Sequence, residues 1–358
     1  MFGHIPFEII LFLMLYAGAA VTDVIACVYL LLRRSNAFDH DVASSVRLRR
    51  WTAVFFAAMA LSHVWYMPIC VLTSSDEIKL GFQVGGLLDC ITIVPLAIIV
   101  LFCMLQDRRR PLWPAYIMTA PLAVGMVVCI ATHSDAFMPM VISYFLLLAI
   151  GLFIYMVHAV KQYGRWLRDN YADLEHKEVW QSFIVLSLIV LMFGIYVGDA
   201  GGPAYKYIVQ VCGIVLVCYL LWRVETLSDL PPQPLPIKEE KVVSNDEFDS
   251  LLQQRCVSTQ LYLQHDLTGI QLAEILGTNR TYLGHYFSSQ NTTYNAYINT
   301  LRINHFINLY REAVAARRPF SAKQLASDSG YRSYSTFSLA FKQRMGQSVT
   351  AWMHETAG

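Results

Sequence analysis

An almost continuous apolar sequence over the first 223 residues constrains this chain more than any other feature. Seven stretches there each supply the roughly 20 apolar residues that cross about 30 Å of hydrocarbon. They are residues 7–32, 51–72, 82–105, 112–131, 137–160, 180–197 and 205–222. Because lipid offers no hydrogen bonds to the backbone, such stretches are expected to be helices. The sequence therefore predicts a domain of seven transmembrane helices over residues 1–223.

The positions of Lys and Arg predict the orientation of these helices, because cationic loops stay on the cytoplasmic side during insertion. The first, third and fifth loops contain twelve Lys and Arg, whereas the second, fourth and sixth, with their margins, contain only Lys79 and Lys206. We expect the N-terminus outside and the C-terminus in the cytoplasm.

Three ionisable residues fall well inside the predicted helices: Asp23, His63 and Asp89. A central Asp costs roughly 2.5 to 3.5 kcal/mol on insertion scales, so each should face the interior of the bundle and find a partner there. Asp23 and His63 are both expected near the midplane, where they could meet, whereas Asp89 lies nearer the outer face. Two interpretations stay open: a signal or ligand site, or internal contacts that fix helix packing.

The composition changes abruptly after residue 223. Residues 224–250 contain four prolines within positions 231–236, followed by the charged residues 238–241 and an acidic run over 245–249. Such a segment favours an extended polyproline conformation of about 3.1 Å per residue. We interpret it as a cytoplasmic linker.

A helical pattern returns in residues 251–358 and contains two helix-turn-helix motifs. In the first, Gly277 supplies the turn and Asn279 can cap the second helix. In the second, over residues 321–342, Ala326 and Gly330 take the places of Ala273 and Gly277. A predicted helix over about 294–314 joins them, and its length of roughly 30 Å approaches one turn of DNA. The region holds ten Lys and Arg against five Asp and Glu, which suits a polyanionic partner.

The paired motifs, the joining helix with Tyr297 and Arg302, and the closing segment 341–352 resemble the AraC/XylS family of bacterial transcription regulators. The resemblance covers about 90 residues. Val349 stands where the family usually has a proline, which should alter only a turn.

The resemblance also implies which residues contact DNA. Base contacts are expected from the positions of Thr281, Gly284 and His285 in the first motif and Tyr334, Ser335, Ser338 and Leu339 in the second. Gly284 has no side chain, and Leu339 can offer only an apolar contact to a thymine methyl. Arg280, Arg332 and Lys342 are expected to contact phosphates, which position the domain without selecting a sequence.

Together these patterns predict an all-α chain: a seven-helix membrane domain, a linker and a tandem helix-turn-helix domain. We find no pattern for an enzyme, a metal site or a cofactor. The expected function is that of a one-component transcription regulator in the inner membrane of a bacterium. Its expected partners are double-stranded DNA, the lipid bilayer and a small-molecule or protein signal, with a homodimer also compatible. The alternative is a transporter or solute-binding membrane protein whose C-terminal domain serves feedback or binds protein.

Overall fold

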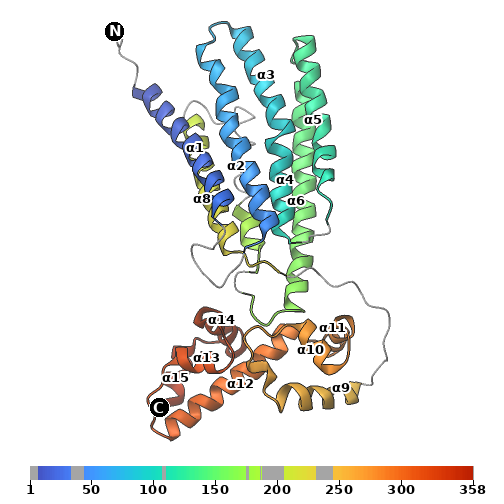
Figure 1. The fold of residues 1–358 in the computed structure, drawn as a ribbon, viewed down its shortest axis with the longest axis vertical. Coiled ribbons are helices and arrows are strands. Elements are labelled where there is room, and N and C mark those ends of the chain that lie inside the picture. The colour runs from blue at the N-terminus through green and yellow to red at the C-terminus, as the bar shows by residue number, and fades with distance from the viewer. Residues whose placement is uncertain are drawn as a thin grey trace. The chain divides into compact units, whose positions relative to one another are not determined.

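The computed structural model describes residues 7–33, 44–106, 110–174, 177–185, 187, 205–230 and 245–357. Within these ranges the regular elements are helices, which confirms the prediction of an all-α chain. The chain forms two compact units (Figure 1). The first consists of residues Met1–Lys161 and Val179–Gln233, and the second of Gln162–Glu178 and Pro234–Gly358. Most of the sixth predicted stretch, 180–197, and residues 231–244 of the predicted linker lie outside the described residues.

The helices of the first unit account for six of the predicted apolar stretches. They are α1 (Phe7–Leu32), α2 (Val46–Tyr66), the 3-10 helix η1 (Met67–Val71), α3 (Ser75–Ile91), α4 (Ile93–Met104), α5 (Trp113–Thr132), α6 (Met138–Arg168) and α8 (Tyr205–Thr226). Among the described residues, six helical segments are long and apolar enough to cross a membrane, with α3 and α4 counted as one segment, Ser75–Met104.

The break between α3 and α4 lies at Thr92, whose φ of −119° and ψ of −73° depart from helical values. Pro95 follows three residues later, and its ring clashes with the carbonyl four residues before it, that of Ile91. The Thr92 amide and hydroxyl both donate to the Leu88 carbonyl, at 3.0 and 2.6 Å. The Leu88 carbonyl therefore accepts two hydrogen bonds from the residue at the break.

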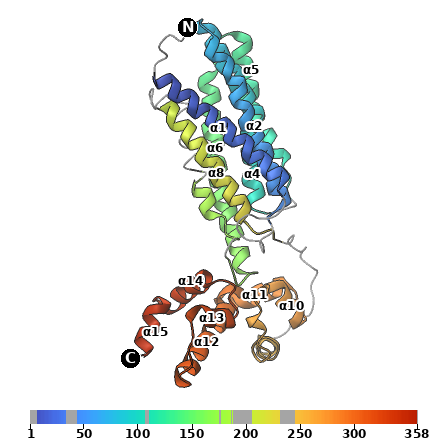
Figure 2. The ribbon, with the colours of Figure 1, turned by 60° about the vertical axis from the view of Figure 1, so that its left-hand side comes forward.

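The helices of the first unit run side by side, with α1 against α2 and α8 (Figures 1 and 2). Large apolar side chains point away from the bundle, and on α6 alone Leu147, Ile150 and Ile154 are between 57% and 68% exposed. A water-soluble protein rarely exposes so continuous an apolar surface. A lipid environment accounts for it.

The second unit is arranged around one long helix, α12 (Tyr294–Ala315). The elements before it are α9 (Asn245–Leu252), the π-helix η2 (Gln253–Val257), the 3-10 helix η3 (Leu261–Leu263), α10 (Gly269–Leu276) and α11 (Arg280–Ser289). Those after it are α13 (Ala322–Asp328), α14 (Tyr334–Met345) and α15 (Val349–Ala357). One hydrophobic cluster includes Ile298 near the start of α12, and another includes Phe306 and Tyr310 further along it. Each motif therefore has its own core, and α12 belongs to both.

Candidate nucleic-acid interface and intramembrane polar clusters

The first helix-turn-helix motif is defined by caps at both of its helices. Thr268 and Gln271 form a capping box at the start of α10, and Gly277 ends that helix with a φ of +74°. The Asn279 side chain then accepts a 2.9 Å hydrogen bond from the Tyr282 amide at the start of α11. Leu283 and Phe287 bury the inner face of α11. Its outer face carries the exposed side chains of Thr281 and His285.

The second motif repeats this construction. Ser321 caps α13 and Ser333 caps α14, each accepting from a backbone amide three residues on, at 3.1 and 3.2 Å. Gly330 forms the turn with a φ of +90°, and a Cβ atom there would lie 2.9 Å from the backbone of Leu263. This turn therefore requires glycine for its conformation and for close packing.

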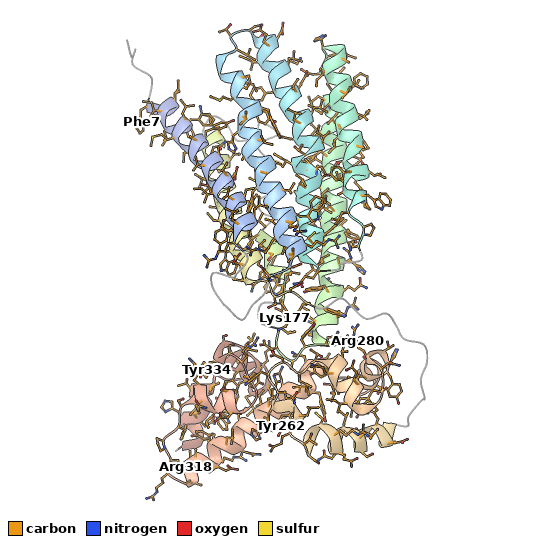
Figure 3. The ribbon with its side chains drawn as sticks, in the orientation of Figure 1. Phe7, Lys177, Tyr262, Arg280, Arg318 and Tyr334 are labelled. Atoms are coloured by element: carbon orange, nitrogen blue, oxygen red, sulfur yellow. The ribbon has the colours of Figure 1, made fainter. Side chains whose placement is uncertain are left out.

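Most of the predicted DNA-contacting side chains lie on the outer faces of α11 and α14. Thr281, His285, Arg332, Ser335 and Lys342 are exposed, whereas Arg280, Tyr334 and Ser338 are half-buried. Figure 3 shows Arg280 and Tyr334 on the same side of the second unit, with Arg318 at its opposite end. The two motifs thus present their second helices in the same direction.

Two of these residues already have partners within the unit. Arg332 lies 3.5 Å from the carboxylate of Asp266 across the surface. The guanidinium of Arg280 lies over the ring of Trp166, 5.6 Å from its centroid. Burial lowers the pKa of Arg280, and the nearby Asp169 opposes that shift. The sequence reasoning missed both Trp166 and Asp169, because the segment that carries them is more than a hundred residues away.

Two of the three ionisable residues predicted inside the membrane lie together. The Asp23 carboxylate on α1 is 3.6 Å from the His63 imidazole on α2, and is only 2% exposed. The other ring nitrogen of His63 lies 3.4 Å from the side-chain oxygen of Gln210 on α8. Tyr16 donates a 2.6 Å hydrogen bond to the His63 carbonyl. Three helices therefore contribute to one polar cluster, and Gln210 was not predicted.

Asp89 belongs to a second cluster. Its carboxylate accepts hydrogen bonds from the Trp65 indole at 3.2 Å and the Tyr66 hydroxyl at 2.7 Å. The predicted set of Asp23, His63 and Asp89 is thus divided between two clusters, whose α2 residues all lie in the last turn of that helix.

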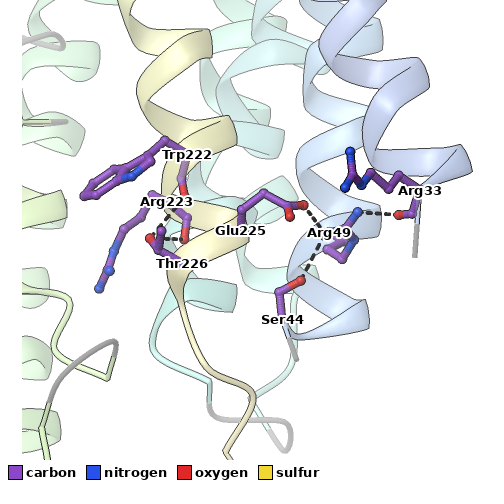
Figure 4. A network of polar contacts seen from close by, with 7 residues as sticks. All are labelled: Arg33, Ser44, Arg49, Trp222, Arg223, Glu225 and Thr226. Atoms are coloured by element: carbon purple, nitrogen blue, oxygen red, sulfur yellow. Dashed lines mark hydrogen bonds and ion pairs between the residues drawn. The ribbon is translucent and has the colours of Figure 1, made fainter. Parts of the chain in front are cut away.

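A third polar cluster ties the ends of α2 and α8 together (Figure 4). Arg49 of α2 forms an ion pair with Glu225 of α8, and it also donates to the Ser44 hydroxyl at 3.0 Å and to the Arg33 carbonyl. The side chains of Arg49 and Glu225 are 7% and 1% exposed. Arg49 falls in the first predicted loop, before the apolar stretch 51–72, but it lies inside α2 in the structure. Its partner is 176 positions away in the sequence.

Residues 272–355 match a protein family described as a helix-turn-helix domain. This match begins inside α10 and covers α11, α12, the whole second motif and most of α15. Comparison with curated proteins and with solved structures found no match.

Proposed function

We propose that this chain, which ends in an AraC-type helix-turn-helix domain and carries six candidate membrane helices, is a membrane-tethered transcription regulator. One polypeptide would then contain both a domain that responds to a signal and a domain that binds promoter DNA. Coupling of about 1 to 3 kcal/mol between the two is enough to change affinity for DNA roughly 5- to 150-fold.

The observation that carries this proposal is the pair of motifs on one rigid helix. Both second helices begin at side-chain caps, expose polar and basic residues, and lie on the same side of the second unit. A tandem arrangement of this kind suits two successive major grooves of one DNA duplex. The net positive charge of this region adds attraction that does not depend on DNA sequence.

The direction of the chain in the membrane follows from the cationic loops. A cytoplasmic C-terminus is required for contact with chromosomal DNA, and the distribution of Lys and Arg supports it. We therefore place the protein in the inner membrane of a bacterium, with residues 224–250 as a cytoplasmic linker.

The signal-responsive element that we favour is the cluster of Asp23, His63 and Gln210. Polar groups inside a membrane are costly and commonly mark functional sites. This cluster joins α1, α2 and α8, and α8 is the last described helix before the linker, so a change in the contacts of Gln210 can alter that helix. A small molecule or a protein contact at the bundle would supply the signal.

Chromatin immunoprecipitation of the full-length protein tests the proposal. A variant combining Arg332→Ala and Lys342→Ala removes two exposed cations at α14. The matched control, Arg311→Ala with Arg318→Ala, removes two exposed cations at the C-terminal end of α12. We expect discrete peaks that the first variant loses and the control keeps. A full-length protein with no peaks above the first variant would instead favour a protein-binding adaptor on a transport-like bundle.

A further inference from the structure

The second unit contains a segment from a distant part of the sequence. Residues Gln162–Glu178, which include the end of α6, belong to the same compact unit as the helix-turn-helix domain. Within this segment Asn170 is 1% exposed and Ala172 is 2% exposed, and Ala172 lies in the hydrophobic core of the first motif. The segment is thus packed as part of the domain.

Main-chain contacts hold the segment at the start of α10. The Gly269 amide donates a 2.8 Å hydrogen bond to the Asn170 carbonyl, and Tyr171 forms an antiparallel bridge with Thr268. A Cβ atom on Gly269 would lie 2.8 Å from the Asp169 carbonyl oxygen. Glycine at the first position of α10 therefore permits this close approach.

Two asparagines on α12, one helical turn apart, donate hydrogen bonds to the same segment. Asn295 donates through its side-chain amide to the carbonyls of Tyr171 and Ala172, at 3.0 and 2.6 Å, and Asn299 donates to the Ala172 carbonyl at 3.0 Å. All three bonds end on backbone atoms of the segment. Recognition of a peptide through its main chain gives affinity with few demands on its side chains.

The side chains of the segment contact both DNA-facing helices. Trp166 lies under Arg280, the first residue of α11, with Asp169 close enough to oppose the effect of burial on the pKa of that arginine. Asp173 accepts a 3.2 Å hydrogen bond from the hydroxyl of Thr336, near the start of α14. Two carboxylates are thus placed at the N-terminal ends of two helices, where a DNA phosphate is also favourably bound.

We propose that residues 166–173 are an internal docking segment that competes with DNA for the binding face of the helix-turn-helix domain. This inference rests on the function proposed above. The segment occupies Arg280, and its two carboxylates repel phosphates from the same helix ends. Undocking exposes that face and raises the affinity for DNA, so a signal that moves α6 controls transcription through this contact.

The test uses the full chain in lipid nanodiscs and random-sequence duplex DNA as the probe. One variant, Asp169→Asn with Asp173→Asn, removes the two carboxylates. A second, Asn295→Ala with Asn299→Ala, removes the amide donors that hold the segment. The control, Glu312→Gln with Asp328→Asn, removes the same number of charges from exposed positions on α12 and α13. Hydrogen exchange of the Gly269 amide reports docking, and exchange along α12 verifies that each variant is folded.

Both docking variants should bind DNA about fivefold or more tightly than the control. DNA added to the unmodified chain should speed exchange at the Gly269 amide, because the segment leaves as DNA binds. Salt-dependent binding that is equal in all variants, or DNA binding that leaves Gly269 protected, would overturn the inference while leaving the proposed function intact. A lack of salt-dependent binding in every variant, the control included, would overturn both.

Discussion

At the scale of single residues, Arg302 is the largest fully buried side chain of the second unit. It donates to the carbonyls of Tyr262 and Gln264 at 2.7 and 2.6 Å, and its guanidinium lies 5.5 Å from the centroid of the Tyr331 ring. Tyr262 belongs to the core of the first motif and Tyr331 to that of the second. Burial lowers the pKa of Arg302, yet an arginine stays charged. One side chain therefore fixes the two motifs relative to each other.

Replacement of this arginine should destabilise the domain. Arg302→Met leaves two carbonyls without a donor, at about 1 to 3 kcal/mol for each buried unsatisfied group. We expect the free energy of unfolding to fall by roughly 2 to 6 kcal/mol, measured by hydrogen exchange of the α12 amides in the full chain. Arg311→Met, an exposed change on the same helix, should have almost no effect. Equal losses in the two variants would contradict the proposed role of Arg302.

Replacement of Gly269 should also lower the stability of the second unit. Gly269→Ala places a Cβ atom against the Asp169 carbonyl, so the backbone of the docked segment must shift. Overpacking of this kind costs roughly 1 to 3 kcal/mol. Gly284→Ala is the control, because a Cβ atom there meets nothing within 4 Å. Thermal unfolding should show a lower Tm for the first variant and an unchanged or higher Tm for the second.

At the scale of helices, local signals in the sequence predicted the second unit well. Gly277 and Asn279 occupy the turn and the cap that their types suggested, and Gly330 repeats this in the second motif. Capping depends on residues a few positions apart, so it can be predicted from a single sequence. The start of α2 was less predictable, because Arg49 was assigned to a loop. It is helical and buried in the structure, since Glu225 supplies a partner from far along the chain.

The cap of α11 provides a prediction at this scale. Asn279→Ala removes the acceptor for the Tyr282 amide and should cost about 1 kcal/mol of stability. Asn279→Ser retains a capping oxygen and should lose much less. Hydrogen exchange at the first amides of α11 separates these variants. If both variants exchanged alike, the cap would not be what stabilises the start of that helix.

At the scale of the whole molecule, the apolar stretches predicted seven membrane helices. Six candidate helices lie among the described residues, and most of the remaining stretch, 180–197, lies outside them. The sequence could not show that residues 162–178 belong with the DNA-binding domain. These residues are held by hydrogen bonds to their backbone carbonyls and by close packing against Gly269, which has no side chain. Neither feature produces a periodic pattern in the amino-acid sequence. The sequence also could not show that Gln210 joins Asp23 and His63. An uncharged glutamine in an apolar helix gives a weaker signal than an ionisable residue does.

The ion pair between Arg49 of α2 and Glu225 of α8 links distant parts of the sequence within the first unit. Arg49→Ala should destabilise this unit by about 3 to 5 kcal/mol, because it leaves a buried carboxylate without its partner. Replacing Arg49 and Glu225 together by methionine should cost less than Arg49→Ala alone. Thermal aggregation of the purified variants measures this, with the exposed Arg50→Ala as control. If the effects of the single variants Arg49→Met and Glu225→Met added up to that of the double variant, the pair would not be coupled.

Because α6 continues into the second unit, it also affects whether proteolysis could release the C-terminal domain from the membrane. The helix has 31 residues, or about 46 Å at 1.5 Å per residue, and residues 162–168 at its end are counted with the DNA-binding domain. The polypeptide therefore enters that domain twice, once through α6 and once after α8. A protease that cleaved only within residues 231–236 would leave the C-terminal fragment bound to residues 166–173. Release of the C-terminal domain would need two independent events, cleavage of the linker and undocking of residues 166–173. Nonspecific proteolysis alone, or a brief movement of the membrane helices alone, would not release it.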